Sequence, residues 1–228
     1  MLEYWQGDAN ATYTIHRDDG FSHLIQVEAA FAGPPFSPLE QVALDRCRGS
    51  VLDVGGGAGR HSLWLQERGL QVTAIEVVPE LVAIMSARGV AEPLEENLFS
   101  LAGRRFDTVL MLMNGLGLTG TLQGVETFCE HARSLLKAGG QVLCDSLDVR
   151  LTTDLVHLAY QQANMDRNLP AGQMCFWIEH AGRRGESFHW LHLDFETLHD
   201  LALRHGCAAE KLGQEENGHY LARITCGN

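Results

Sequence analysis

A glycine-rich link joins a short apolar segment to an amphipathic one in the first third of the chain. The apolar segment is Ser50–Val54 (SVLDV), the link is 55–59 (GGGAG), and the amphipathic segment is 60–68 (RHSLWLQER), with Gly69 as its stop. The first segment is typical of a strand and the second of a helix. Glycines let the backbone turn sharply and approach a ligand that a Cβ would exclude. The link therefore predicts a ligand-binding loop at the carboxyl end of a strand.

Short β-branched runs alternate with helical stretches through the middle of the chain. Predicted strands lie at 50–54, 70–76, 90–94, 106–113 and 141–146, and predicted helices at 60–68, 79–88 and 123–137. This alternation is typical of a mostly parallel sheet covered by helices. It predicts an α/β fold with a doubly wound, seven-stranded, mostly parallel, Rossmann-like sheet and an antiparallel last strand.

No linker-like stretch divides the chain, so we expect a single domain over 1–228. Its predicted parts are an N-terminal helical extension (1–48), a core that binds the ligand of the glycine loop (49–146), an inserted β-hairpin (170–194), and a C-terminal helix and hairpin (195–228). Ser37 and Glu40 have the spacing of a capping box, which indicates a helix start within the extension. Asn217 and Gly218 form a favoured two-residue turn for the last hairpin.

Charge, hydropathy and cysteine spacing exclude several classes of protein. The 228 residues include 29 acids against 17 bases, for a net charge of −12, which disfavours nucleic acid because that partner requires clustered Lys and Arg. We expect no membrane partner, since no apolar run reaches about 18 residues, and the first residues lack the pattern of a signal peptide. The six cysteines show no metal-ligand spacing. This predicts reduced thiols, a cytoplasmic location and no metal site.

The residues around the glycine loop separate two classes of ligand. The dinucleotide fingerprint G-x-G-x-x-G, started at Gly55, requires a small residue where the chain has Arg60. Asp53, just before the loop, would repel a pyrophosphate. S-adenosylmethionine carries no phosphate, and its ammonium and sulfonium groups are cationic. The acid beside the loop therefore favours this methyl donor over a nicotinamide dinucleotide.

The loop resembles that of the class I S-adenosylmethionine-dependent methyltransferases, whose pattern after the first strand is D-x-G-x-G-x-G. The matching residues are Asp53, Gly55, Gly57 and Gly59. The segment 135–143 (LLKAGGQVL) is similar to a family segment in which proline is common at the place of Ala138. The resemblance covers residues 50–146, and GAGRHSLWL, FDTVLMLMNGLGLTGTL and FHWLHLDFETL extend it to a poorly characterised bacterial branch of the small-molecule type.

The resemblance implies S-adenosylmethionine as cofactor and a set of residues that contact it. In the family an acid at the end of the second strand holds the ribose hydroxyls, and Glu76 has that place. An Asp after the third strand often contacts the adenine, and Asn97 stands there in this chain. The predicted donor-binding residues are Asp53, Gly55, Gly57, Gly59, Arg60, Glu76, Asn97, Met113 and Asn114.

The acceptor is expected beyond the ends of the fourth and fifth strands. Candidate catalytic residues are Asn114, Asp145 and His61, although a turn, a sheet-end carboxylate and a structural histidine are the alternative interpretations. Further candidate bases are His16, His189, His192 and His219. A base is needed only if the acceptor must lose a proton, because the sulfonium is already activated. The tetrapeptide D/N-P-P-[FYW] of the family's amine and nucleobase enzymes is absent, since the chain reads NGLG from Asn114.

These observations favour an enzyme that methylates a small molecule, with oxygen, nitrogen or carbon as the acceptor atom left open. Two alternatives remain at this stage. One is a non-catalytic protein or subunit that binds S-adenosylmethionine or its homocysteine product. The other is a nicotinamide-dependent oxidoreductase, against which Asp53 and Arg60 argue. A homodimer is a further expectation, because the inserted hairpin would offer a sheet edge for pairing.

Overall fold

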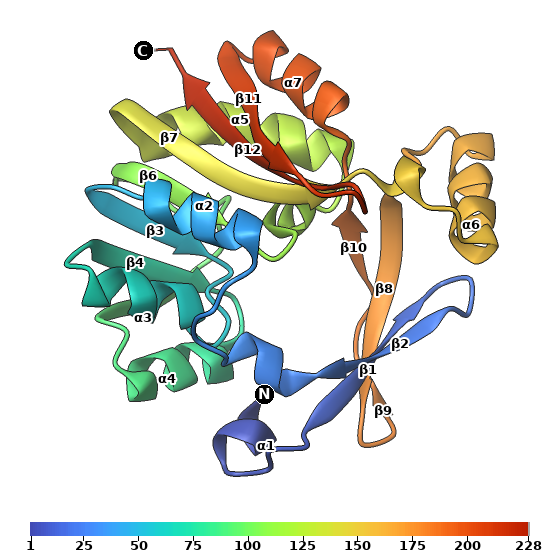
Figure 1. Cartoon of the computed structure of the whole chain (residues 1–228), viewed down its shortest axis with the longest axis horizontal. Helices are drawn as coiled ribbons and strands as arrows, with labels where there is room; N and C mark the ends of the chain where they lie inside the picture. Colours follow the sequence, from blue (N-terminus) through green and yellow to red (C-terminus); the bar gives the residue numbers. More distant parts are fainter. Residues whose placement is uncertain (228) are drawn as a thin grey trace.

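The structure is a computed structural model, and it describes residues 1–227. Two sheets form its framework, and Figure 1 shows the smaller one standing beside the larger. The larger sheet has seven strands in the order β11-β12-β7-β6-β3-β4-β5, and the smaller has five, with β10-β8-β1-β2 in sequence and β9 paired to β8. The two sheets share one chain without a separate linker between them.

The predicted parallel core is confirmed in the larger sheet. Its strands are β3 (Ser50–Val54), β4 (Gln71–Glu76), β5 (Glu92–Glu95), β6 (Phe106–Met111), β7 (Leu136–Leu147), β11 (Cys207–Gln214) and β12 (His219–Cys226). Strands β3 to β7 run parallel to their neighbours, whereas β12 is antiparallel to both β7 and β11. The last hairpin turns within Glu215–Gly218, where the Gly218 N–H donates to the Glu215 carbonyl at 3.0 Å. Asn217 and Gly218 therefore lie in the turn but are not its two central residues, contrary to the sequence prediction. This arrangement places the ends of β3, β4, β6 and β7 and the start of β12 along one edge.

Helices cover both faces of the larger sheet because its central strands are apolar on both sides. They are α2 (Pro38–Arg46), α3 (Arg60–Glu67), α4 (Pro79–Arg88), α5 (Leu122–Leu135) and α7 (Phe195–Arg204). Val51 packs in a core that includes α2 and α3 residues, and the adjacent Leu52 packs in a core that includes α5 and α7 residues. Successive strand residues point to opposite faces, so a continuous apolar strand requires this double cover.

The N-terminal segment differs from the expectation of a helical extension. It contains the short α1 (Leu2–Trp5), strands β1 (Thr12–Arg17) and β2 (Ser22–Gln26), the 3₁₀ helix η1 (Val27–Ala30), and then α2. Only α2 was predicted, and its capping box between Ser37 and Glu40 is present. The expectation was wrong because β1 and β2 form a hairpin, and β1 is stabilised by pairing with β8, far along the chain.

The inserted hairpin is confirmed and completes the smaller sheet. It consists of β8 (Gln173–His180) and β10 (Phe188–Leu191), which pair antiparallel, with the two-residue β9 (Arg183–Arg184) between them. Before it, the 3₁₀ helix η3 (Val149–Leu151) and α6 (Leu155–Asp166) connect the two sheets, and α6 lies beside β8 at the right of Figure 1. Helix α6 was not predicted, although Asp154 caps it.

Cys207 and Cys226 form a disulfide, which contradicts the expectation of reduced thiols for this pair. The antiparallel register of β11 and β12 sets the two residues directly opposite each other. Their spacing along the chain gave no sign of this pairing, because the register follows from the hairpin turn and a bulge near Lys211. Within residues 1–227, none of the helices combines the length and apolar character needed to cross a membrane.

Candidate functional site

The glycine loop joins β3 to α3 with a backbone that side chains would oppose. Gly55, Gly57 and Gly59 have φ angles of 68°, 57° and 80°, a region that residues with a Cβ rarely adopt. The N–H groups of Gly55 and Gly56 both donate to the Ile75 carbonyl, at 2.9 and 3.1 Å, which ties the loop to β4. The sequence pattern and the backbone therefore agree on why glycine occupies these positions.

Glu76 ends β4 directly beside this loop. Its carboxylate accepts hydrogen bonds from the N–H of Gly57 at 3.2 Å and from the N–H of Val77 at 2.8 Å. Glu76 is half-buried, and each carboxylate oxygen has two lone pairs, so the group keeps acceptor capacity for a ligand diol. The structure thus brings Glu76 to the loop, as the sequence analysis predicted.

A crevice of about 180 Å³ opens over the loop. It is lined by Ala30, Asp53, Val54, Gly55, Gly56, Gly57, Ala58, Arg60, His61, Leu112, Met113, Gly115, Leu118 and Trp190. Trp190 packs so closely on Gly117 that a Cβ there would overlap its indole ring. The predicted donor residues of the loop therefore meet Met113 and Trp190, which comes from the inserted hairpin and forms part of the pocket wall.

The crevice fits the cationic, phosphate-free ligand class chosen from the sequence. A Cβ at Gly57 would meet only the Gly55 carbonyl oxygen, at 3.9 Å, so the space over that glycine is open. Asn114 has a φ of 59°, and its buried Oδ1 has no hydrogen-bond partner within residues 1–227. A buried acceptor of this kind requires a donor, and an ammonium group supplies one. Asn114 lies between the lining residues Met113 and Gly115, and Glu76 bonds to the lining residue Gly57, but neither is itself a lining residue. Their acceptor atoms would suit a donor-rich ligand at the rim of the crevice.

Asp53 contributes to the crevice mainly by fixing the start of α3. It is buried, and its Oδ2 accepts a hydrogen bond from the Ser62 hydroxyl. Burial raises the pKa of Asp53, while the nearby His61 and the Ser62 bonds oppose the rise. Asp53 therefore stabilises the junction between the loop and α3, and its carboxylate is not an exposed anion.

Arg60 and His61 attach the N-terminal segment to the donor loop. Arg60 pairs with Glu40 of α2 at 3.0 Å and donates to the Ala32 carbonyl at 2.9 Å. The His61 Nε2 lies 2.9 Å from the same Glu40 carboxylate, and the imidazole is buried. Burial opposes ionisation of Glu40, yet bonds from His61 and Ser37 and the charge of Arg60 outweigh it and lower its pKa to about 2. His61 is thereby held by Glu40, which favours its structural interpretation over a role as base.

The two remaining donor-site predictions occupy exposed positions. Asn97 follows β5, where its Oδ1 accepts from the Phe99 N–H at 2.9 Å in a local turn. Met113 is 47% exposed with a φ of 65°, and its sulfur lies 3.7 Å from an Arg60 nitrogen. Met113 is brought to the crevice lining, whereas Asn97 is not among the lining residues.

Asp145 links the donor crevice to a histidine that the sequence analysis could not single out. It is 1% exposed, and its Oδ1 accepts from the Gly115 N–H at 2.8 Å. Its Oδ2 lies 2.8 Å from the Nε2 of His219, at the start of β12. The hydrogen bond to Asp145 raises the pKa of His219, against the opposing effect of burial. The pairing depends on the register of β12 against β7, which sets Leu221 opposite Asp145.

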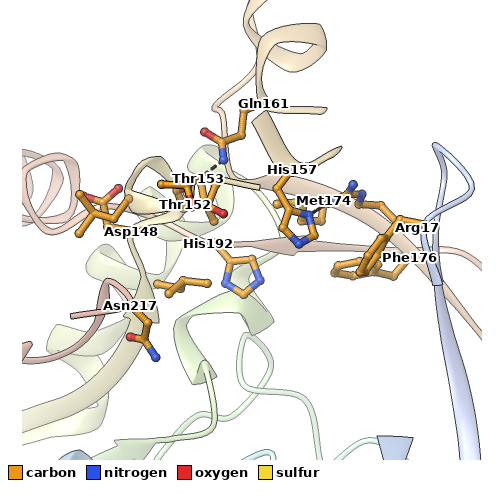
Figure 2. Close-up of a pocket in the computed structure, with 14 residues that line it drawn as sticks. Arg17, Asp148, Thr152, Thr153, His157, Gln161, Met174, Phe176, His192 and Asn217 are labelled. Atoms are coloured by element: carbon orange, nitrogen blue, oxygen red, sulfur yellow. Dashed lines mark hydrogen bonds between the residues drawn. The ribbon is translucent and has the colours of Figure 1, made fainter. Parts of the chain in front are cut away.

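A larger cavity of about 510 Å³ lies between the smaller sheet, α6 and the end of β7 (Figure 2). Its lining comprises Arg17, Phe21, Leu147, Asp148, Val149, Leu151, Thr152, Thr153, His157, Gln161, Met174, Phe176, His192 and Asn217. Of these residues, only His192 was among the candidate bases predicted from the sequence. They come from segments that meet only in three dimensions. Figure 2 shows His192 between His157 and Asn217.

The comparisons with known proteins agree with this geometry. Residues 51–140 match a family model described as a methyltransferase domain. A crystal structure of an S-adenosylmethionine-dependent methyltransferase from Bacteroides fragilis, in complex with S-adenosyl-L-homocysteine, is 32% identical over 99% of this chain and 92% of that one, with a TM-score of 0.87. The chain therefore belongs to the S-adenosylmethionine-dependent methyltransferases, as the glycine loop predicted.

Two more distant matches are also methyltransferases. A ubiquinone biosynthesis O-methyltransferase of Xylella fastidiosa (strain M23) is 27% identical over 162 residues, and the chain spans 63% of the length of that relative. A methyltransferase structure from Streptomyces caelestis shares the fold with a TM-score of 0.65 at 14% identity, covering 87% of this chain and 92% of that one.

Within residues 1–227, no group of three or more His, Cys, Asp or Glu side chains is arranged to hold a metal ion.

Proposed function

We propose that this chain transfers a methyl group from S-adenosylmethionine to a small-molecule acceptor. The observation that supports this most strongly is the glycine loop, which lines the crevice and donates the Gly57 N–H to the Glu76 carboxylate. Glu76 would hold the ribose hydroxyls, and the loop would accommodate the nucleoside where a Cβ would exclude it. The bound donor supplies an electrophilic methyl group on a cationic sulfur.

The chain's own contribution is to orient the two reactants and exclude water. Asn114 and Met113 would contact the amino-acid portion of the donor, and Arg60, held by Glu40, would lie beside its carboxylate. Asp145 positions Asn114 through the Gly115 N–H. The acceptor would approach from the cavity between the sheets, because its lining adjoins the same edge of the larger sheet.

We propose a hydroxyl oxygen as the acceptor atom. The curated relatives from Xylella fastidiosa are named for O-methylation, whereas two solved structures of the same fold, at 15% and 16% identity, are named for N-methylation of a glycopeptide and of a sugar. The absence of the D/N-P-P-[FYW] tetrapeptide after β6 agrees with an acceptor other than a planar amine. Homodimer formation and a cytoplasmic location stay predictions, and light scattering of the purified chain would test the former.

Calorimetric titration with S-adenosylmethionine, S-adenosylhomocysteine and NADH tests the proposal. We expect both sulfur compounds to bind and NADH to give no heat. Transfer of a labelled methyl group to components of a metabolite extract would then separate an enzyme from a non-catalytic binder. NADH binding without binding of either sulfur compound would support the oxidoreductase alternative and overturn the proposal.

A further inference from the structure

The cavity between the two sheets has a size suited to a small organic ligand. Its volume of about 510 Å³ lies within the range of about 300–1,000 Å³ that is usual for such sites. None of its lining residues also lines the donor crevice. A ligand in this cavity would therefore add to the donor without displacing it. Asp145 lies between the two sites, because it bonds to Gly115 of the crevice and its charge acts on His192 of the cavity.

One part of the lining is apolar and aromatic. Phe21 comes from the N-terminal hairpin, Met174 and Phe176 come from β8, and Leu147 and Leu151 come from the end of β7 and from η3. Aromatic rings and a thioether favour flat, apolar ligands through offset and edge contacts. These side chains favour an aromatic ligand over a sugar or another heavily hydrated molecule.

The charged side chains of the lining already have counter-ions. The Arg17 guanidinium, only 3% exposed, donates to both carboxylate oxygens of Asp19 at 2.9 and 2.7 Å. Asp148 accepts from Nε and Nη2 of Arg150 at 2.8 and 2.7 Å. A charged ligand group would enter this space without a free partner, and burying an unpaired charge is costly. The cavity is therefore electrostatically matched to an uncharged molecule.

His192 is the polar side chain of the lining that lacks a partner. Its Nδ1 is buried and makes no hydrogen bond within residues 1–227. His157, in contrast, uses its Nδ1 to accept from Arg17 at 3.1 Å, since a guanidinium only donates. Burial and, to a smaller extent, the neighbouring His219 lower the pKa of His192 to about 4, although Asp145 opposes this shift. His192 is therefore a neutral imidazole near pH 7, able to accept a proton.

We propose that this cavity binds the methyl acceptor as an uncharged hydroxyaromatic molecule and that His192 accepts its hydroxyl proton. The inference rests on the proposed function. As the acceptor oxygen bonds to the methyl carbon, the carbon–sulfur bond breaks and its electron pair stays on sulfur. The hydroxyl proton passes to His192 and then to water. A weak base suffices because an oxygen that is gaining a methyl group becomes strongly acidic.

Binding of three matched naphthols tests the class of acceptor. With S-adenosylhomocysteine bound, we expect 2-naphthol to bind, and its 6-carboxylate and 6-aminomethyl derivatives to bind at least about tenfold more weakly because their charges lack partners. Thr153 is exposed and lines the cavity, so Thr153→Trp should weaken 2-naphthol binding by about tenfold, whereas Thr225→Trp, on β12 outside the cavity, should not.

Each result bears on one part of the inference. No binding of any naphthol, or equal binding of the charged derivatives, would overturn the acceptor class while leaving the donor site intact. Equal effects of the two tryptophan variants would overturn the location. If S-adenosylhomocysteine does not bind to the unmodified chain, the proposed function itself fails.

His192→Gln tests whether His192 accepts the hydroxyl proton. His189→Gln is the matched control, because His189 lies in β10, just before His192, and is exposed. We expect His192→Gln to bind 2-naphthol within about threefold of the unmodified chain and to methylate it about 100-fold more slowly. Its rate should rise with pH as the naphthol ionises, whereas the unmodified chain should show a flat profile around neutrality. A flat profile in His192→Gln, an equal loss in His189→Gln, or binding without methylation in the unmodified chain would contradict the assignment.

Discussion

The donor crevice and the acceptor cavity are built in opposite ways. The donor crevice is built around six consecutive residues, 53–58, and Glu76 at the end of the next strand bonds to the backbone of this loop. The acceptor cavity is mostly side chains, supplied by β1, α6, β8 and the segments after β7 and β10. A local backbone site tolerates little change, whereas a site assembled from distant side chains can change its specificity one residue at a time.

The largest expected effect is the loss of donor binding in a variant of the glycine loop. Gly57→Arg fills the open space over the loop, so it should weaken S-adenosylhomocysteine binding by at least about 100-fold. Gly69→Arg is the matched control, because Gly69 also has a positive φ and open surroundings but follows α3 away from the crevice. Calorimetry measures both variants, and equal losses would show that backbone strain and not the crevice causes the effect.

Glu76→Gln should have the next largest effect on the donor side. The amide keeps the shape of the side chain but removes the charge that strengthens its hydrogen bonds, which are each worth about 1.5–3 kcal/mol when charged. We expect donor affinity to fall by about 10- to 100-fold and 2-naphthol affinity to be unchanged. A variant with normal donor affinity would remove Glu76 from the site.

Glu40→Gln should lower stability, and it also removes the charge that holds Arg60 and His61 at the donor crevice. Its folded-state pKa of about 2 is below the ordinary value of 4.5, so its ionised form stabilises the chain above about pH 4.5, and that contribution is lost as pH falls toward 2. We expect thermal unfolding at pH 7 to shift down by about 5 °C, corresponding to about 2 kcal/mol. The difference between variant and unmodified chain should shrink at acidic pH, and a constant difference would contradict this electrostatic explanation.

Asp145→Asn should have the smallest and most specific effect, because Asp145 bonds to Gly115 of the donor crevice and to His219, which lines neither site. Asp145 raises the pKa of His219, so the variant should return that pKa toward its ordinary value of 6.5. The protonated pair stabilises the fold below about pH 6.5, and this contribution is lost as pH rises through the raised pKa. NMR titration of the imidazole signals measures the shift, and an unchanged pKa would exclude the pairing.

The sequence predicted that residues of the glycine loop and Glu76 lie together, because this information is local, while their contacts with the donor stay predictions. Gly55, Gly57 and Gly59 occupy consecutive alternate positions, and Glu76 follows at the end of the next strand. Their spatial relation is fixed by parallel pairing of adjacent strands, which the hydrophobic pattern already indicated. Arg60 and His61 were predicted near the loop for the same reason, but their shared partner Glu40 was not, because α2 packs there through tertiary contacts.

The acceptor side was harder to predict because its residues meet only after distant pairings form. Strand β1 pairs with β8, which brings Arg17 opposite Phe176. Alternation in Thr12–Arg17 followed by Asp19 and Gly20 was a usable hairpin signal that a helical interpretation of the N-terminal segment overlooked. His192 had no such local signal, since its lack of a partner depends on what the folded chain places around it.

Donor and acceptor are proposed to occupy separate sites. This is tested most directly by calorimetric titration of S-adenosylhomocysteine into three proteins: the unmodified chain, Gly57→Arg and Thr153→Trp. The account predicts equal affinity for the unmodified chain and Thr153→Trp, with binding abolished in Gly57→Arg. Loss of binding in Thr153→Trp together with retention in Gly57→Arg would contradict it.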